Sequence, residues 1–419
     1  MMQLKTIKSF TKLVLAVLVL TLPLQISSLI YEPLWGRGFA NNFINIYLNL
    51  TEVLIALGIF GLLITNFLEK KRINTGPKLF LIPLLFFLGL ALISIFLSPY
   101  KEQVWHFFLA IKIIEIFPLY ILLISNVLKK EDLIKLFSFA MSLQAFWAIL
   151  QVLFQKSLGL TALGEPNISN EIAQLAKITF DGFTFIRGYG TFSHPNILGG
   201  FLTISILSTI AFIKPLNKDH KILILLQIFG LLASFSRSAI LALIVGLLCL
   251  ISNQKAIRTW VKRTIAGLLG LVCTTMFFLN GLPWGTASFL ERIAGYKTAI
   301  EMIKNHIAGV GFNSHTLFLE EILGTSLKPW EYQPVHNIFL LIGTEMGLAS
   351  LIFAIIMLGF LLKKTFHKKP AFILMIALIT LGFFDHYLLS LSQGIYLAIF
   401  VFGVLAMSYE GKTDFAKSA

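Results

Sequence analysis

The sequence predicts an all-α, polytopic membrane protein of about twelve transmembrane helices, and three observations support this. Hydrophobic residues make up 57% of the 419-residue chain, whereas charged residues make up 13%. The mean hydropathy is +0.84, which is too apolar for a surface that faces water. Apolar runs of about 18 to 25 residues recur along the chain, and each can cross a hydrocarbon layer about 30 Å thick. We therefore expect residues 1–419 to form a single integral membrane domain.

The apolar runs, taken in chain order, define the predicted helices. They span residues 11–30, 44–68, 79–98, 103–128, 135–156, 196–213, 221–236, 238–253, 264–282, 336–362, 370–388 and 391–408. The first run follows a basic start, as in a signal peptide, but it has no clear small-x-small cleavage site and continues past Pro23. We expect it to be a retained helix. Cys249 and Cys273 lie inside predicted helices, where a thiol packs as a small apolar side chain.

The distribution of basic residues predicts the topology. The formal net charge is +14, and 23 of the 34 Lys and Arg residues fall at the two termini and in alternate connections between the helices. The positive-inside rule places these connections and both termini in the cytoplasm. Of the remaining basic residues, 10 lie outside and Lys112 lies within a helix. The charge thus reflects topology, and we do not expect nucleic-acid binding.

Two connections are too long to be simple links, and the predicted topology places both outside. Residues 157–195 form the first, which ends in the motif RGYGTFSHPN. Residues 283–335 form the second, a large loop before the tenth helix. It contains an amphipathic stretch that predicts an interfacial helix ended by Gly309 and Gly311. Its apolar residues recur every three or four positions: Phe289, Ile293, Tyr296, Ile300, Ile303 and Ile307.

Three external arginines run against the charge trend. Arg187, Arg237 and Arg292 lie beside apolar sequence at or near the predicted outer interface. A guanidinium offers a fixed fork of donors that suits bidentate phosphate binding. The alternative is that each one reaches lipid headgroups or pairs with a nearby acid. The acids considered are Glu165, Asp181 and Glu291.

His336 is the candidate base, because a neutral imidazole accepts a proton near neutral pH. It lies in the sequence PVHN, where a polar loop ends and a helix begins. The alternative is that it anchors the helix at the membrane interface. His194 lies in a second motif, but the following Pro195 favours a role in shaping the helix entrance. The chain lacks the HExxH, CxxC and P-loop motifs, so we expect no metal, nucleotide or other cofactor.

Four segments resemble the O-antigen ligase family, the WaaL-like branch of a superfamily that also contains Wzy-type polymerases and bacterial protein O-oligosaccharyltransferases. The matching segments are RGYGTFSHPNILGGFL at 187–202, SFSRSAILAL at 234–243, HIAGVGFNSH at 306–315 and VHNIFLLIGTEMGL at 335–348. Their order and spacing are similar to those of the family, over residues 185–350. One departure is Ala308 before Gly309, where the family often has proline.

The resemblance implies a membrane glycosyltransferase of the GT-C type in the bacterial inner membrane. Such an enzyme takes a glycan from undecaprenyl pyrophosphate and transfers it, with inversion, to a hydroxyl of lipid A-core or another surface glycan at the periplasmic face. It further implies that His336 deprotonates the acceptor and that Arg187, Arg237 and Arg292 hold the pyrophosphate. Asp385, His194 and Asn337 are expected to support them. No metal is needed, because the donor carries its own leaving group.

Two alternatives remain open from the sequence. A Wzy-type polymerase uses the same donor but a second lipid-linked glycan as acceptor. A secondary transporter would require ionisable residues across the membrane midplane. Glu52, Lys112 and Glu115 lie inside predicted helices, and we expect Lys112 and Glu115 to pair on one helix face. Lining the path of the donor is the functional alternative for them.

Overall fold

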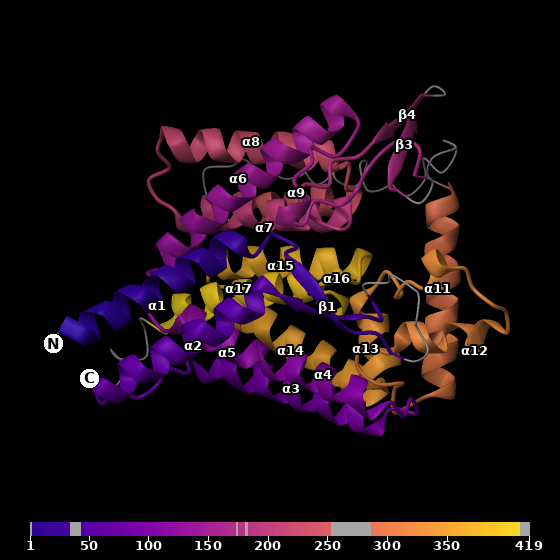
Figure 1. Ribbon diagram of the computed structural model, residues 1–419, viewed down its shortest axis with the longest axis horizontal. Coiled ribbons are helices and arrows are strands. Elements are labelled where there is room, and N and C mark those ends of the chain that lie inside the picture. Colours follow the sequence, from indigo (N-terminus) through magenta and orange to yellow (C-terminus); the bar gives the residue numbers. More distant parts are fainter. Residues whose placement is uncertain (1, 34–42, 173–174, 181–182, 253–285, 411–419) are drawn as a thin grey trace.

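The computed structural model describes residues 2–33, 43–172, 175–180, 183–252 and 286–410, and these are mostly helical (Figure 1). Within them, seven helices are long and apolar enough to cross a membrane. They are α2 (Leu50–Leu68), α3 (Lys78–Leu97), the pair α4 (Gln103–Ile114) and α5 (Ile116–Ile124), α6 (Lys130–Phe154), α7 (Pro195–Phe212), α14 (Leu348–Thr365) and α17 (Ser392–Glu410). A multi-pass helical protein is therefore confirmed, while the number twelve stays a prediction. The expected helix at 264–282 lies outside the described residues.

The other described helices complete the bundle and its connections. They are α1 (Met2–Thr21), α8 (Lys218–Ser234), α9 (Arg237–Ser252), α11 (Thr286–Asn305), α12 (Leu319–Leu323), α13 (Ile338–Met346), α15 (Lys369–Phe384) and α16 (Tyr387–Ser390). Three short 3-10 turns, η2 (Thr161–Leu163), η3 (His315–Phe318) and η4 (Pro329–Glu331), lie in the two long loops.

Helix α7 lies at the centre of the bundle, where it packs against α6, α8, α9 and α15. Small residues allow this close approach. A Cβ atom at Gly199 would lie 2.7 Å from Ser236 and 2.8 Å from Ala239, at the start of α9. A Cβ atom at Gly200 would collide with Tyr387, in α16. Two motifs, those beginning at Arg187 and at Ser234, are therefore brought together by direct packing.

Two pairs of short antiparallel strands show that the all-α prediction was wrong in detail. β1 (Ser27–Tyr31) pairs with β2 (Ile46–Asn49), and β3 (Lys177–Phe180) pairs with β4 (Phe183–Ile186). The first helix was predicted to reach Ile30, but α1 ends at Thr21, because Pro23 has no amide hydrogen for the helix ladder. The second predicted helix begins six residues later than predicted, at Leu50, because the residues just before it form strand β2.

A break at Gly347 divides the predicted helix 336–362 into α13 and α14. Gly347 has φ +86, and a Cβ atom there would lie 2.6 Å from the backbone of Ala308. The facing loop bonds to the end of α13, with Val310 N–H donating to the Thr344 carbonyl at 2.8 Å and Gly311 N–H to the Glu345 carbonyl at 2.8 Å. The motifs 306–315 and 335–348 thus interlock, and this fixes the position of α13.

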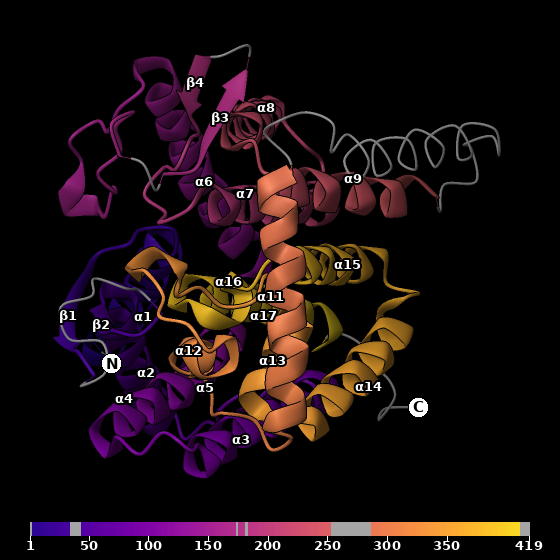
Figure 2. The ribbon, with the colours of Figure 1, turned by 90° about the vertical axis from the view of Figure 1, so that its right-hand side faces the viewer.

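Helix α11 crosses one end of the bundle, nearly perpendicular to α14 and α15 (Figures 1 and 2). We call this end, which also carries β3, β4 and α12, the loop end. The predicted apolar stripe of α11 is only partly buried: Ile300 is 47% exposed and Ile307, beyond the helix, 65%. Ala299 and Met302 are buried instead, because α11 turns the neighbouring face toward α13. The helix ends at Asn305, before the predicted Gly309.

The expected Lys112–Glu115 pair is wrong. Lys112 Nζ forms its ion pair with Glu52 of α2 and also donates to the Tyr47 carbonyl. Glu115 lies at the break between α4 and α5 and accepts a hydrogen bond of 3.0 Å from Tyr396 of α17, which also donates to Glu52 at 3.0 Å. Positions three apart on a helix can pair, but residues of other parts of the chain supply the partners of Lys112 and Glu115 instead.

Candidate functional site

A cavity of about 560 Å³ lies at the loop end and brings together side chains from most of the sequence motifs. Its lining includes six of the seven predicted site residues: Arg187, His194, Arg237, Arg292, His336 and Asp385. They come from the loop before α7, the starts of α7 and α9, helix α11, the segment before α13 and the end of α15. The seventh, Asn337, is adjacent to His336 in the chain.

Arg187 is held from both sides. In the loop that follows it, Gln151 of α6 accepts from the amides of Tyr189 at 2.9 Å and Gly190 at 2.8 Å. Arg187 itself donates through Nε to the Ser234 carbonyl at 2.8 Å and through Nη2 to Asn196 at 2.7 Å. Burial lowers the pKa of Arg187 to about 10, so the guanidinium remains charged at neutral pH.

Arg237 is the first residue of α9 and follows Phe235, which has a left-handed conformation with φ +47. Its guanidinium is exposed to the cavity and has no hydrogen-bond or ion-pair partner among the described residues. Arg292, from α11, donates to the carbonyl of Phe384 at the end of α15. The cavity is therefore lined by the guanidinium groups of Arg237, which has no described partner, and Arg292, which has one, together with that of Arg187.

The acids proposed as arginine partners do not pair with these arginines in the described part of the chain. Glu165 accepts from Gln151 at 2.8 Å and from the amides of Leu158 and Leu160 at 2.7 Å each. Glu291 lines the cavity and forms no ion pair with any residue that the structure describes, and Asp181 lies outside those residues. The cavity therefore keeps a concentration of positive charge, the condition for binding an anion.

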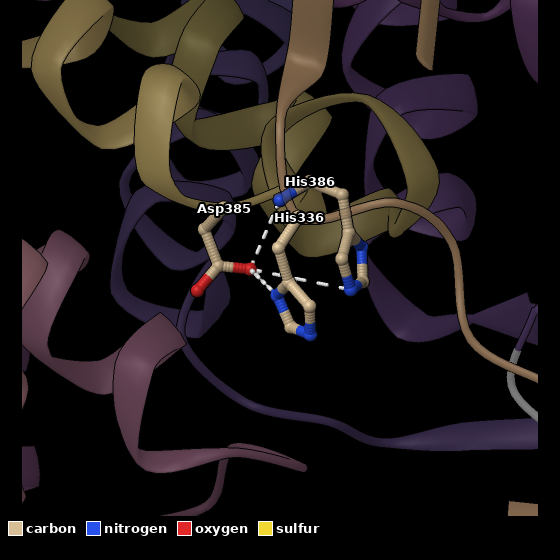
Figure 3. Close-up of side chains that lie close together, drawn as sticks. All are labelled: His336, Asp385 and His386. Atoms are coloured by element: carbon tan, nitrogen blue, oxygen red, sulfur yellow. Dashed lines mark hydrogen bonds and ion pairs between the residues drawn. The ribbon is translucent and has the colours of Figure 1, made fainter. Parts of the chain in front are cut away.

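His336 faces Asp385 across the junction of α13 and α15 (Figure 3). Its Nδ1 lies 3.4 Å from Asp385 Oδ1, an ion-pair separation rather than a regular hydrogen bond. The His386 amide also donates to Oδ1, at 2.9 Å, and Asn196 Nδ2 donates to Oδ2 at 2.9 Å. Arg187, Asn196, Asp385 and His336 thus form one connected row of polar groups.

The Asp385 carboxylate is the electrostatic centre of this row. It is 4% exposed, and its burial by itself raises the pKa. The contact with His336 Nδ1 and the positive charge of Arg292 outweigh that effect and lower the pKa of Asp385 well below its usual range. Asp385 is therefore ionised at every pH at which the protein is expected to work.

Asn337 fixes the direction of His336. Its Oδ1 caps α13 by accepting from the amides of Phe339 at 2.9 Å and Leu340 at 3.0 Å. Its Nδ2 donates to the Phe383 carbonyl at 3.0 Å, at the end of α15. One amide side chain thus ties the start of α13 to the end of α15, which are the two elements that carry His336 and Asp385.

His194 lies at the entrance of α7. Its Nδ1 accepts from the Asn196 amide at 3.1 Å and caps α7, with Pro195 as the first residue of that helix. Burial lowers the pKa of His194 to about 3, so the ring is neutral at physiological pH. It orients Asn196, and through Asn196 both Arg187 and Asp385.

Sequence reasoning missed two members of the site, Asn196 and His386. The His386 ring centre lies 4.9 Å from that of His336, and its Nδ1 lies 2.7 Å from Ser390 Oγ. Burial lowers the pKa of His386 to about 3, so this ring is also neutral. The available signal was adjacency: His386 follows Asp385, and Asn196 closes the motif that begins at Arg187.

The sequence predicted no metal site, yet His336, Asp385 and His386 offer donor atoms within 4.8 Å of one another. Motif searches miss such a group because its members come from two separate segments. A divalent cation bound there would share a single cavity with three guanidinium groups. The repulsion disfavours a cation, and the same charges favour a phosphate or pyrophosphate.

Comparison with known families identifies part of the chain. Residues 222–355 match the family model described as O-antigen ligase. The match includes Arg237, Arg292 and His336, and it confirms the resemblance seen in the sequence motifs. No curated protein gives a match. The family supports a membrane enzyme that acts on glycans, of the O-antigen ligase or polymerase type.

Proposed function

From this O-antigen ligase match, we propose that the protein is a GT-C type glycosyltransferase of the bacterial inner membrane. It moves a glycan from undecaprenyl pyrophosphate to an acceptor hydroxyl, on lipid A-core or another surface glycan, at the outer face. The observation that carries the proposal is the cavity at the loop end, where three guanidinium groups lie beside a histidine with an ionised aspartate.

The arginines form the pyrophosphate side of the cavity. All five N–H donors of Arg237 are free of described partners, whereas Arg187 has two of its donors engaged by protein groups. Negative charge grows on the leaving pyrophosphate as the bond to the anomeric carbon breaks. Guanidinium groups already fixed in place stabilise that charge without reorganisation, which is the role a metal ion takes in other phosphate chemistry.

His336 forms the acceptor side. Its Nδ1 faces Asp385, which leaves Nε2 free to take the proton of the acceptor hydroxyl. The acceptor oxygen then attacks the anomeric carbon, the bond to the pyrophosphate oxygen breaks with its electron pair, and the proton moves to Nε2. The ionised Asp385 stabilises the imidazolium that results. A direct attack of this kind inverts the anomeric configuration.

An apolar cavity supports a lipid-linked substrate. It has a volume of about 250 Å³ and lies between α3, α13, α14, α15 and α17. Ile338 and Phe339, which follow His336 and Asn337 in the chain, line it, and so does Phe353 of α14. An apolar space that begins beside the polar site fits a substrate with a charged head and a hydrocarbon tail.

The test is transfer by the purified protein of a glycan from undecaprenyl pyrophosphate to lipid A-core, in the presence of a chelator. Activity is expected to persist with the chelator. A deletion strain separates the ligase from the Wzy-type polymerase, because loss of a ligase leaves long polymer on the carrier lipid. Loss of a polymerase leaves single repeats on the acceptor, and that outcome would reassign the acceptor to a second lipid-linked glycan.

A further inference from the structure

An exposed tryptophan lines the candidate site and has no role in the chemistry described above. Trp330, in the turn η4, is 48% exposed and contributes to the wall of the cavity at the loop end. Its indole N–H donates to no group among the described residues. By contrast, the indole of Trp105 donates to the Ile44 carbonyl at 3.0 Å, and that of Trp147 to Glu165 at 3.3 Å.

The turn that carries Trp330 is rigidly built. The Lys328 amide donates to the Glu331 carboxylate at 2.7 Å, and the Glu331 amide returns to the Lys328 carbonyl at 2.9 Å. Gln333 Nε2 donates to the Trp330 carbonyl at 3.1 Å. Two residues after Trp330, the Tyr332 ring is buried and its hydroxyl donates to Glu320, which anchors the segment to α12. The indole is therefore presented on a fixed backbone.

Trp330 belongs to the same segment of the chain as His336. It precedes His336 by six residues, and both side chains line the cavity. Those arginines belong to the loop before α7 and to the start of α9, elements of a separate layer of the bundle (Figure 2). A group that rests on Trp330 therefore lies in the cavity that His336 also lines, on a segment other than those that carry Arg187 and Arg237.

We propose that Trp330 is the platform on which a sugar ring of the acceptor stacks beside His336. This inference rests on the proposed function and deepens it. Lys328 Nζ lies over one face of the indole, 5.4 Å from the ring centroid, so the opposite face is the one offered to the C–H groups of a pyranose, together with an N–H donor for a hydroxyl. The acceptor class is accordingly a glycan that ends in a hexopyranose with one apolar face, and Trp330 sets the preference for it.

The test measures the acceptor and the donor separately. Trp330→Ala is expected to raise the KM for lipid A-core with a terminal hexose about 2- to 12-fold, the range for loss of one aromatic contact. It should weaken direct binding of the same core oligosaccharide by a similar factor. The affinity for the undecaprenyl-pyrophosphate donor and kcat should stay unchanged. Trp330→Phe and Trp330→Tyr should retain most of the wild-type acceptor affinity.

The matched control is Phe183→Ala, which removes a 69% exposed aromatic ring in β4 that does not line the cavity. Its acceptor KM should equal that of the wild type. The inference is overturned if Trp330→Ala leaves acceptor binding unchanged, or if it weakens donor binding instead. Direct binding of the oligosaccharide needs no turnover, so a wild-type protein without transfer activity would refute the proposed function but leave this test decisive.

Discussion

Removal of Arg237 and removal of Arg187 are expected to have different consequences, although both groups are assigned to the pyrophosphate. Arg237 has no hydrogen-bond or ion-pair partner among the described residues, so Arg237→Ala removes no such interaction from the described part of the folded protein. Arg187 donates to the Ser234 carbonyl and to Asn196, and Asn196 in turn donates to Asp385. Arg187→Ala therefore also disturbs the row of groups that orients the base.

The magnitudes follow from the bonds involved. A hydrogen bond to a charged group contributes about 1.5 to 3 kcal/mol, so loss of one bond weakens donor binding about 10- to 150-fold. Arg237→Ala should show this loss with an unchanged melting temperature. Arg187→Ala should show the same loss together with a destabilisation of about 1 to 3 kcal/mol, because the Ser234 carbonyl and Asn196 lose a donor.

The assay is the dissociation constant of undecaprenyl-pyrophosphate glycan for the purified variants, measured beside thermal unfolding in the same detergent. Arg237→Lys is the informative second variant, because an ammonium keeps the charge but cannot form the bidentate fork. It should recover only part of the affinity. Wild-type donor affinity in Arg237→Ala would refute the assignment of this cavity wall to the pyrophosphate.

Three further outcomes are expected. Asp385→Asn should lower turnover by up to about 10⁴-fold with donor affinity retained, because the neutral amide no longer stabilises the imidazolium. An unchanged kcat in steady-state kinetics would contradict this. Burial lowers the pKa of His315 to about 4 from 6.5, so the unfolded chain binds a proton first as the pH falls. Stability is then lost between about pH 6.5 and 4, by about 2 kcal/mol at pH 5. His315→Gln should abolish that acid loss in thermal unfolding, and an unaltered pH dependence would exclude His315 as its source. Single cysteines in place of Ser169 and Ser326 should react with an impermeant thiol reagent in intact cells, and labelling only after lysis would reverse the topology.

The helical bundle was largely predictable, because long apolar runs leave few alternatives to a membrane helix. The predictions were wrong where a contact with a residue distant in the sequence, and not the local sequence pattern, determined the structure. Gly347 looked like one small residue inside a long helix, and only the facing Ala308 explains why the helix breaks there. Lys112 had an acid three residues away, yet it pairs with Glu52 of another helix. The two strand pairs are too short to show a clear alternation of apolar residues.

The predicted site residues are spatially close because the motifs mark the ends of helices that meet at the loop end. Arg187, Arg237 and His336 each stand out by position: an arginine against the charge trend, or a histidine at a helix start. Asn196 and His386 do not stand out by position in this way. They belong to the site because Asn196 Nδ2 and the backbone amide of His386 both donate to the Asp385 carboxylate. The bond between Asn196 and Asp385 joins residues 189 positions apart in the sequence, a separation that no local pattern spans.

The most direct test of the account is the turnover of His336→Gln with saturating donor and acceptor in the presence of a chelator, with donor affinity measured on the same preparation. The account predicts donor affinity close to that of the wild type and a loss of turnover of about 10²- to 10⁴-fold, the usual cost of removing a general base. Turnover above about a tenth of the wild-type value would contradict the role of His336 as the base.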